Sequence, residues 1–180
     1  MSTPYLLRKA DEAIVEMETS VFRHFAVVGD QGSGKMSFVR LMKERSGDLG
    51  QNFIVVTLEE TFDSKNLVGT YVCSETGEFV FKKGPLTVAA EQGLWLILRN
   101  IDQSPPDLLS FLLPLVQENK LQVTSAFSIT PKLGFRIVAL CHGGHSRGLS
   151  QSLDDSSSIS PFLSQLYLLT LDHLEAREDF

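Results

Sequence analysis

Residues 29–37 combine glycines, a lysine and serines in a spacing that suits phosphate binding. The segment reads Gly29-Asp30-Gln31-Gly32-Ser33-Gly34-Lys35-Met36-Ser37, which contains the G-x-x-x-x-G-K pattern of a phosphate-binding loop. The glycines let backbone N–H groups surround a polyphosphate, and the helix that follows adds partial positive charge at its N-terminus. Lys35 would reach the outer phosphates. The sequence therefore predicts nucleotide binding at residues 29–37, with a purely structural glycine turn as the alternative.

The residue after the lysine departs from the pattern. A Ser or Thr hydroxyl at this position normally binds Mg²⁺, but this chain has Met36. Ser37 is poorly placed to replace it, because one step along a helix rotates a side chain by about 100°. The sequence thus predicts a chain that holds a nucleotide but hydrolyses it weakly or not at all.

The elements around this loop predict an α/β fold. An apolar strand at 25–28 precedes it, and a helix from Ser37 to about Arg45 follows. Further strands are predicted at 53–58, 94–98, 135–140 and 166–171, and further helices at 5–18, 86–92 and 106–118. Alternating residues suggest β-hairpins at 77–84 and 120–130, and a Gly- and Ser-rich loop spans 142–160. Such alternation indicates a mostly parallel sheet of five strands, with helices on both faces and ligands at the carboxyl ends of the strands.

Composition restricts the possible classes of protein. The 180 residues suffice for a sizeable core, and 43% are hydrophobic. A net charge of -6 argues against a general nucleic-acid-binding surface. Two cysteines, Cys73 and Cys141, form no disulfide framework and favour a reducing compartment. No apolar run is long enough to cross a membrane, and the N-terminus lacks the pattern of a signal peptide.

Several motifs outside the loop carry a more specific resemblance. They are Asn66-Leu67-Val68-Gly69-Thr70-Tyr71, Gly77-Glu78-Phe79-Val80-Phe81, Gly84-Pro85-Leu86, Leu112-Leu113-Pro114-Leu115-Val116-Gln117-Glu118 and Gly134-Phe135-Arg136. Together with the loop they resemble the dynein-related AAA+ domains, and most closely the first AAA module of the midasin family. The resemblance covers roughly residues 23–178. It implies a leading amphipathic helix at 1–22 and an AAA+ core at 23–180. The chain stops before the helical lid that usually follows an AAA+ core, so we expect it to be a fragment or a truncated form of a larger protein.

The departures from the family bear on catalysis. The strand at 94–98 should lead into two acidic residues, but Arg99 and Asn100 follow it, so Mg²⁺ binding is in doubt as well. Neither residue can act as a general base, although the Arg99 guanidinium could serve as a counter-charge in place of the metal. His142 is at best a loose substitute for the polar residue expected after the fourth strand. The segment 161–166, where the resemblance implies an arginine that acts on a neighbour, contains none.

Two other features invite functional interpretations. Cys141, His142 and His145 are metal-ligating types, but three residues without a fourth ligand are weak evidence, and no metal site is predicted. The expected hairpin at 77–84 either packs on its own domain or contacts a neighbouring AAA module or a client, as similar inserts in the family suggest.

The resemblance implies an ATP- or ADP-binding module of a factor that assembles the large ribosomal subunit in the nucleus. Its implied partners are neighbouring AAA modules or pre-ribosomal factors, with neither direct nucleic-acid binding nor membrane attachment. Two alternatives remain open. One is a scaffold that has lost nucleotide altogether, and the other is an ATPase that is active only with partner subunits.

Overall fold

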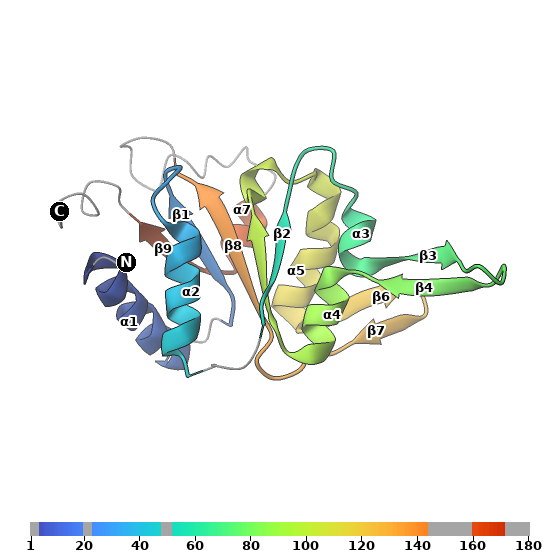
Figure 1. Cartoon of the computed structure of the whole chain (residues 1–180), viewed down its shortest axis with the longest axis horizontal. Coiled ribbons are helices and arrows are strands. Elements are labelled where there is room, and N and C mark those ends of the chain that lie inside the picture. The colour runs from blue at the N-terminus through green and yellow to red at the C-terminus, as the bar shows by residue number, and fades with distance from the viewer. Residues whose placement is uncertain (1–3, 20–22, 48–51, 144–159, 172–180) are drawn as a thin grey trace. The chain divides into compact units, whose positions relative to one another are not determined.

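The fold is built on one central sheet. The computed structural model describes residues 4–19, 23–47, 52–143 and 160–171. Five strands form the sheet in the order β2-β5-β8-β1-β9 (Figure 1). In chain order these strands are β1 (Phe25–Gly29), β2 (Ile54–Thr57), β5 (Trp95–Arg99), β8 (Arg136–His142) and β9 (Tyr167–Leu171). The predicted α/β class with a five-stranded sheet is confirmed, and β1–β9 and β2–β5 both pair in parallel.

Helices alternate with these strands along the chain. They are α1 (Pro4–Thr19), α2 (Lys35–Arg45), α3 (Ser64–Val68), α4 (Pro85–Gln92), α5 (Leu109–Glu118) and α7 (Ser160–Leu163). Two 3₁₀ turns, η1 (Ile101–Gln103) and η2 (Pro106–Leu108), precede α5. The predicted helix at 106–118 therefore begins as a 3₁₀ turn, and α3 was not predicted. In the part of the chain that the structure describes, no helix is long and apolar enough to span a membrane.

The chain divides into two compact units. The first unit contains residues 1–51 and 139–180 and holds α1, α2, β1 and β9. Here α1 packs on α2, and an ion pair between Arg45 and Asp11 joins the two helices. The strand β1 lies beside β9 in a register that pairs Gly29 with Leu171. The core of this unit is apolar because β1 is buried along its whole length and Phe38 and Met42 of α2 are fully buried.

The second unit contains residues 52–138. Its strands β2 and β5 pair in parallel, so that Val56 lies opposite Leu98. The first four residues of β5 are buried, while Arg99 at its end is exposed. Helix α4 packs on both of these strands. It begins at Pro85, which suits the first turn of a helix, and Gly93 caps its C-terminal end in a left-handed conformation.

Two antiparallel hairpins belong to the second unit, as the sequence predicted, but the extent of the first differs. The segment 79–83 is a single strand, β4 (Phe79–Lys83), which pairs with β3 (Gly69–Cys73). The prediction that 77–84 forms a hairpin by itself was therefore wrong. Gly77, with φ of +83°, forms the turn between the two strands instead. The second hairpin joins β6 (Leu121–Thr124) to β7 (Phe127–Ile129), within the predicted range.

Candidate nucleotide site

The phosphate-binding loop lies between β1 and α2. Gly29 is the last residue of β1, and Lys35 is the first residue of α2. Between them the chain makes a tight turn in which the Ser33 N–H donates to the carbonyl oxygen of Asp30 at 3.2 Å. Gly32 and Gly34 have φ of +83° and +82°, in the region that side chains disfavour. The glycines at these two positions therefore make the loop conformation possible.

Lys35 folds back over the start of the loop. Its Nζ donates to the carbonyl oxygen of Gly29 at 2.5 Å and to that of Asp30 at 2.7 Å. The side chain is half-buried. Because an ammonium group has three donors and no acceptor, it holds carbonyl oxygens here and can also donate to phosphate oxygens. The structure thus places the lysine over the residues that a bound polyphosphate would contact.

Gly29 and Ser33 are in close contact within this loop. A Cβ atom at Gly29 would lie 2.7 Å from the Ser33 Oγ and 2.9 Å from the carbonyl oxygen of Leu171. The Ser33 side chain is buried, and its hydroxyl has no hydrogen-bond partner among the described residues. Buried hydroxyls in folded proteins nearly always have a partner. This unsatisfied hydroxyl is therefore a place where a ligand oxygen would complete the hydrogen bonding.

The N-terminus of α2 directly follows the loop. Its N-cap is Gly34, which has no side chain that could accept from the first N–H groups of the helix. These groups and the helix dipole together favour an anion. Helix α1 borders the same region, because the Leu6 Cδ1 lies 3.6 Å from the position of a Cβ at Gly34.

The two residues after the lysine differ in exposure. Met36 is half-buried and Ser37 is exposed. Mg²⁺ prefers hard oxygen ligands, and a thioether sulfur is a soft one. The loop residues 29–35 therefore suit a polyphosphate, whereas Met36 does not suit the metal.

The end of β8 also touches the loop, which the sequence analysis missed. The Gly143 N–H donates to the carbonyl oxygen of Gly29 at 3.3 Å. A Cβ at Gly143 would lie 3.3 Å from the Val28 Cγ1, so a small residue suits this close approach. A glycine directly after a predicted core strand was the available signal. His142 precedes it and is exposed.

Two more residues of metal-ligating types, Cys141 and His145, belong to this end of β8 or the segment after it. Cys141 is buried, while His145 lies outside the described residues. Among the residues that the structure describes, no group of three His, Cys, Asp or Glu side chains could hold a metal ion.

In the second unit, Arg99 and Asn100 mark the end of β5. The Arg99 carbonyl oxygen accepts from the Leu58 N–H at 3.0 Å, and the Arg99 side chain is exposed. Asn100 has φ of +56°, a left-handed conformation that Asn tolerates better than most residues. The sharp turn that follows the strand places Asp102 in η1. No carboxylate stands at position 99 or 100, and the loss of catalysis expected from this stays a prediction.

A loop of this spacing between a strand and a helix of a parallel α/β sheet is typical of P-loop nucleotide-binding domains. Residues 24–156 match the AAA domain of the dynein-related subfamily, and the chain belongs to this family. The predicted family membership is therefore confirmed.

Curated relatives point to the same branch. The chain is 35% identical to midasin of Dictyostelium discoideum over 125 residues, which are 67% of this chain and 2% of that protein. It is 29% identical to midasin of Giardia intestinalis over 66% of the chain and 2% of that protein. It is also 28% identical to protein NorQ of Paracoccus denitrificans over 81% of the chain and 53% of that protein. The chain thus spans a small part of the midasins and about half of NorQ.

Solved structures share the fold. NtrX from Brucella abortus in complex with ADP has a TM-score of 0.69 at 18% identity, covering 99% of this chain and 38% of that one. The ATP complex of the same protein has a TM-score of 0.67 at 17% identity and similar coverage. At this identity the likeness shows the AAA+ fold alone.

Proposed function

We propose that this chain is a nucleotide-binding AAA module that holds ATP or ADP in the loop 29–37 and hydrolyses it weakly or not at all. The observation that carries the proposal is the arrangement of the loop in the first unit. The Lys35 ammonium lies over the carbonyl oxygens of Gly29 and Asp30, and a buried, unsatisfied Ser33 hydroxyl lies beside them. Among the structural neighbours, NtrX is seen with both ADP and ATP, which supports the same ligand class.

The loop residues would act by positioning and charge alone. Lys35 would donate to the outer phosphate oxygens, while other backbone N–H groups of the loop would donate to the phosphates that lie closer to the ribose. Gly29 would keep the Ser33 side chain and the Leu171 carbonyl close to the loop. The residues suit a polyphosphate without requiring a metal ion.

We expect weak hydrolysis because residues that phosphoryl transfer normally needs are missing from this chain. This reaction depends almost entirely on positioning and on neutralising charge, mostly through Mg²⁺. Met36 offers no oxygen to the metal, and the end of β5 carries Arg99 and Asn100 in place of two carboxylates. Each missing group would normally stabilise the transition state by on the order of 3 kcal/mol. The bound nucleotide would thus mainly stabilise the folded state.

The resemblance to midasin extends the proposal to a biological role. In this interpretation the module works in assembly of the large ribosomal subunit, in the nucleus, beside neighbouring AAA modules. The similarity to the two midasins supports this role. Because those alignments cover 2% of each midasin, the role of the whole protein needs its own test, namely co-purification of the tagged chain with pre-ribosomal particles.

Titration of the purified chain with a fluorescent ATP or ADP analogue tests nucleotide binding, first with Mg²⁺ and then with EDTA. We expect saturable binding that survives EDTA, because the site lacks the usual metal ligand. Lys35→Ala should abolish it. Arg40→Ala is the matched control, because it removes an exposed cation from the same helix outside the loop.

Other results would support the alternatives. Absence of binding in both conditions would leave a scaffold without nucleotide. Binding that strictly needs Mg²⁺ would contradict the metal-independent site. Hydrolysis that appears only after neighbouring modules are added would show an ATPase completed by its partners.

A further inference from the structure

The hairpin β3–β4 carries much of the exposed apolar surface of the described residues. Eight large hydrophobic side chains are exposed in the described part of the chain, and four of them lie on this hairpin. They are Tyr71, Val72, Phe79 and Val80, with exposed fractions of 62%, 37%, 77% and 45%. A two-stranded hairpin cannot bury its own faces and gains stability only by packing on something else.

The two faces of the hairpin differ. On one face Tyr71 pairs with Phe81, and their rings meet edge to face with centroids 5.3 Å apart. Phe81 is half-buried and packs over Gly69, where a Cβ would lie 2.6 Å from the Phe81 Cζ. The other face has Val72 paired with Val80, and no described aromatic ring contact lies on it. The valine face therefore has no ring contact of its own, although Val72 and Val80 are less exposed than Tyr71 and Phe79 on the other face.

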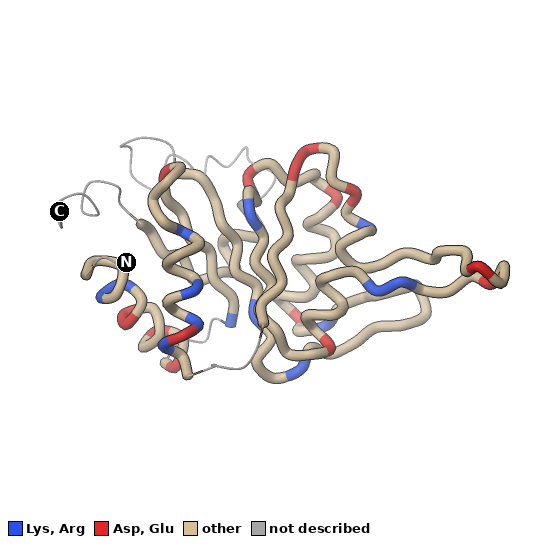
Figure 2. The backbone as a smooth tube through the Cα atoms, in the orientation of Figure 1, with Lys and Arg blue, Asp and Glu red and all other residues tan. Residues whose placement is uncertain are grey.

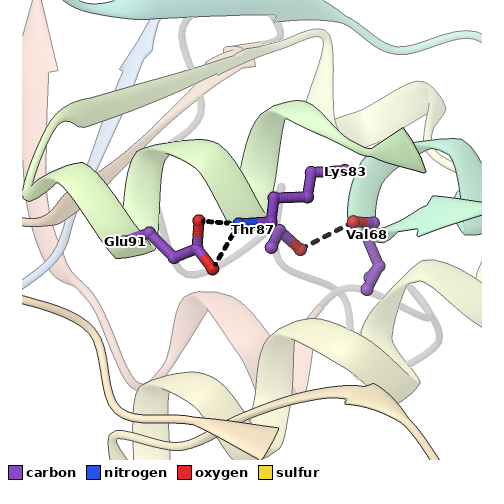
Figure 3. Close-up of polar contacts among 4 residues, drawn as sticks. All are labelled: Val68, Lys83, Thr87 and Glu91. Carbon is purple, nitrogen blue, oxygen red and sulfur yellow. Dashed lines mark hydrogen bonds and ion pairs between the residues drawn. The ribbon is translucent and has the colours of Figure 1, made fainter. Parts of the chain in front are cut away.

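The hairpin is held firmly at its base (Figure 3). The Gly84 N–H and the Thr87 hydroxyl both donate to the carbonyl oxygen of Val68, at 2.8 Å and 2.6 Å. The Lys83 Nζ pairs with both carboxylate oxygens of Glu91, at 2.7 Å and 2.9 Å. Because these contacts fix the hairpin on α4, it presents its valine face in one orientation, which lowers the cost of ordering on binding.

Charged residues of opposite sign flank Val80 on the valine face. Side chains on a strand alternate between faces, so Val80 and Lys82 of β4 point the same way. Glu78 directly precedes the strand and continues its pairing, because its carbonyl oxygen accepts from the Ser74 N–H at 2.8 Å, so we place its side chain on the same face. Glu78 and Lys82 are each two residues from Val80, or about 6.6 Å. Figure 2 shows acidic residues at the turn of the hairpin and basic residues further along β4. Lys83 is paired with Glu91, whereas Lys82 is exposed.

We propose that the valine face docks a second copy of this chain. A two-fold axis near Val80 brings the valines of both copies together. The same axis sets Glu78 of each copy against Lys82 of the other. The charges of this face are self-complementary, as an isologous interface requires. With two valines and one pair of opposite charges from each copy, we expect a weak dimer that forms only at high protein concentration.

Sedimentation velocity over a wide range of concentration tests this proposal. The wild-type chain should show a monomer–dimer equilibrium that weakens with added salt. Glu78→Lys and Lys82→Glu each turn two attractions into two repulsions, so either variant alone should dimerise about tenfold more weakly or worse. An equimolar mixture of the two variants restores both attractions and should regain the dimer. The double variant with both changes in one chain should regain it as well.

A matched control separates the two faces of the hairpin. Phe79→Ser removes the most exposed apolar side chain from the opposite face and should leave the dimer unchanged. Circular dichroism of each variant verifies that the fold is intact.

The proposal is overturned if the wild-type chain stays monomeric at every concentration. It is also overturned if the mixture of variants fails to recover, or if Phe79→Ser dissolves a dimer that the charge reversals leave intact. Binding of a different protein to this face by a chain that remains monomeric would replace the second copy with that partner.

Discussion

Gly29 offers a sharp test of the loop geometry. In Gly29→Ala the new Cβ would approach the Ser33 Oγ to 2.7 Å and the Leu171 carbonyl oxygen to 2.9 Å. Real Cβ atoms essentially never lie so close to other atoms, so either the loop or the end of β9 must move. The serine hydroxyl can rotate away, but the carbonyl belongs to a strand that pairs with β1 itself. We therefore expect a loss of about 2 kcal/mol, typical of an overpacked site.

The control for this substitution is Gly32→Ala in the same loop. No atom lies within 4 Å of a Cβ at Gly32, so its substitution meets only the strain of a positive φ, roughly 1 kcal/mol. Urea unfolding followed by circular dichroism gives both values. The double variant Gly29→Ala with Ser33→Ala should recover about 1 kcal/mol more than Ser33→Ala gains alone, because it removes the contact with the hydroxyl and leaves the carbonyl. If Gly29→Ala proved as stable as the wild type, or if the two substitutions were additive, the close packing described for this loop would be wrong.

Three further substitutions test separate parts of the structure. Ser33→Ala alone removes a buried hydroxyl without a described partner. The free energy of unfolding in urea should therefore stay equal or rise by about 1 kcal/mol, while nucleotide affinity falls. A clear loss of stability would show that the hydroxyl already has a partner. Gly84→Ala would place a Cβ 2.3 Å from the Leu67 carbonyl oxygen, so its thermal midpoint should fall by the equivalent of about 3 kcal/mol, and a wild-type midpoint would contradict the geometry. Thr87→Val leaves the Val68 carbonyl with one donor fewer and should cost about 1 kcal/mol in urea unfolding, whereas the conservative Thr87→Ser should cost less.

The sequence predicted the elements whose signals are local and strong. Strand β1 and helix α2 enclose a glycine pattern that fits few other contexts, and both were found where expected. The short strand β3 was missed, because Gly69–Cys73 gains its strand conformation from pairing with β4 and not from its own pattern. Contacts made across the chain, such as Gly143 with Gly29, were likewise out of reach of any local pattern.

The candidate site shows the same division. Spacing alone named every loop residue from Gly29 to Ser37, since those residues are neighbours in the chain. Spacing could not show that the Lys35 ammonium lies on the carbonyl oxygens of the loop, or that the Ser33 hydroxyl is buried without a described partner. Those facts depend on how β9 and α2 pack around the loop, which is decided by tertiary contacts.

Several features of the loop lower the stability of the fold, and a bound anion would offset their cost. Gly32 and Gly34 hold positive φ values, and the flexibility of glycine in the unfolded chain costs roughly 1 kcal/mol at each. The Ser33 hydroxyl is buried without a described partner, and the N-cap of α2 provides no side-chain acceptor. A ligand that binds only the folded state offsets such costs by mass action, about 2.7 kcal/mol when its concentration is a hundred times the Kd. Hydrolysis is not needed for that effect, so a loop that keeps Lys35 and replaces the metal-binding hydroxyl with Met36 is consistent as a binding site alone.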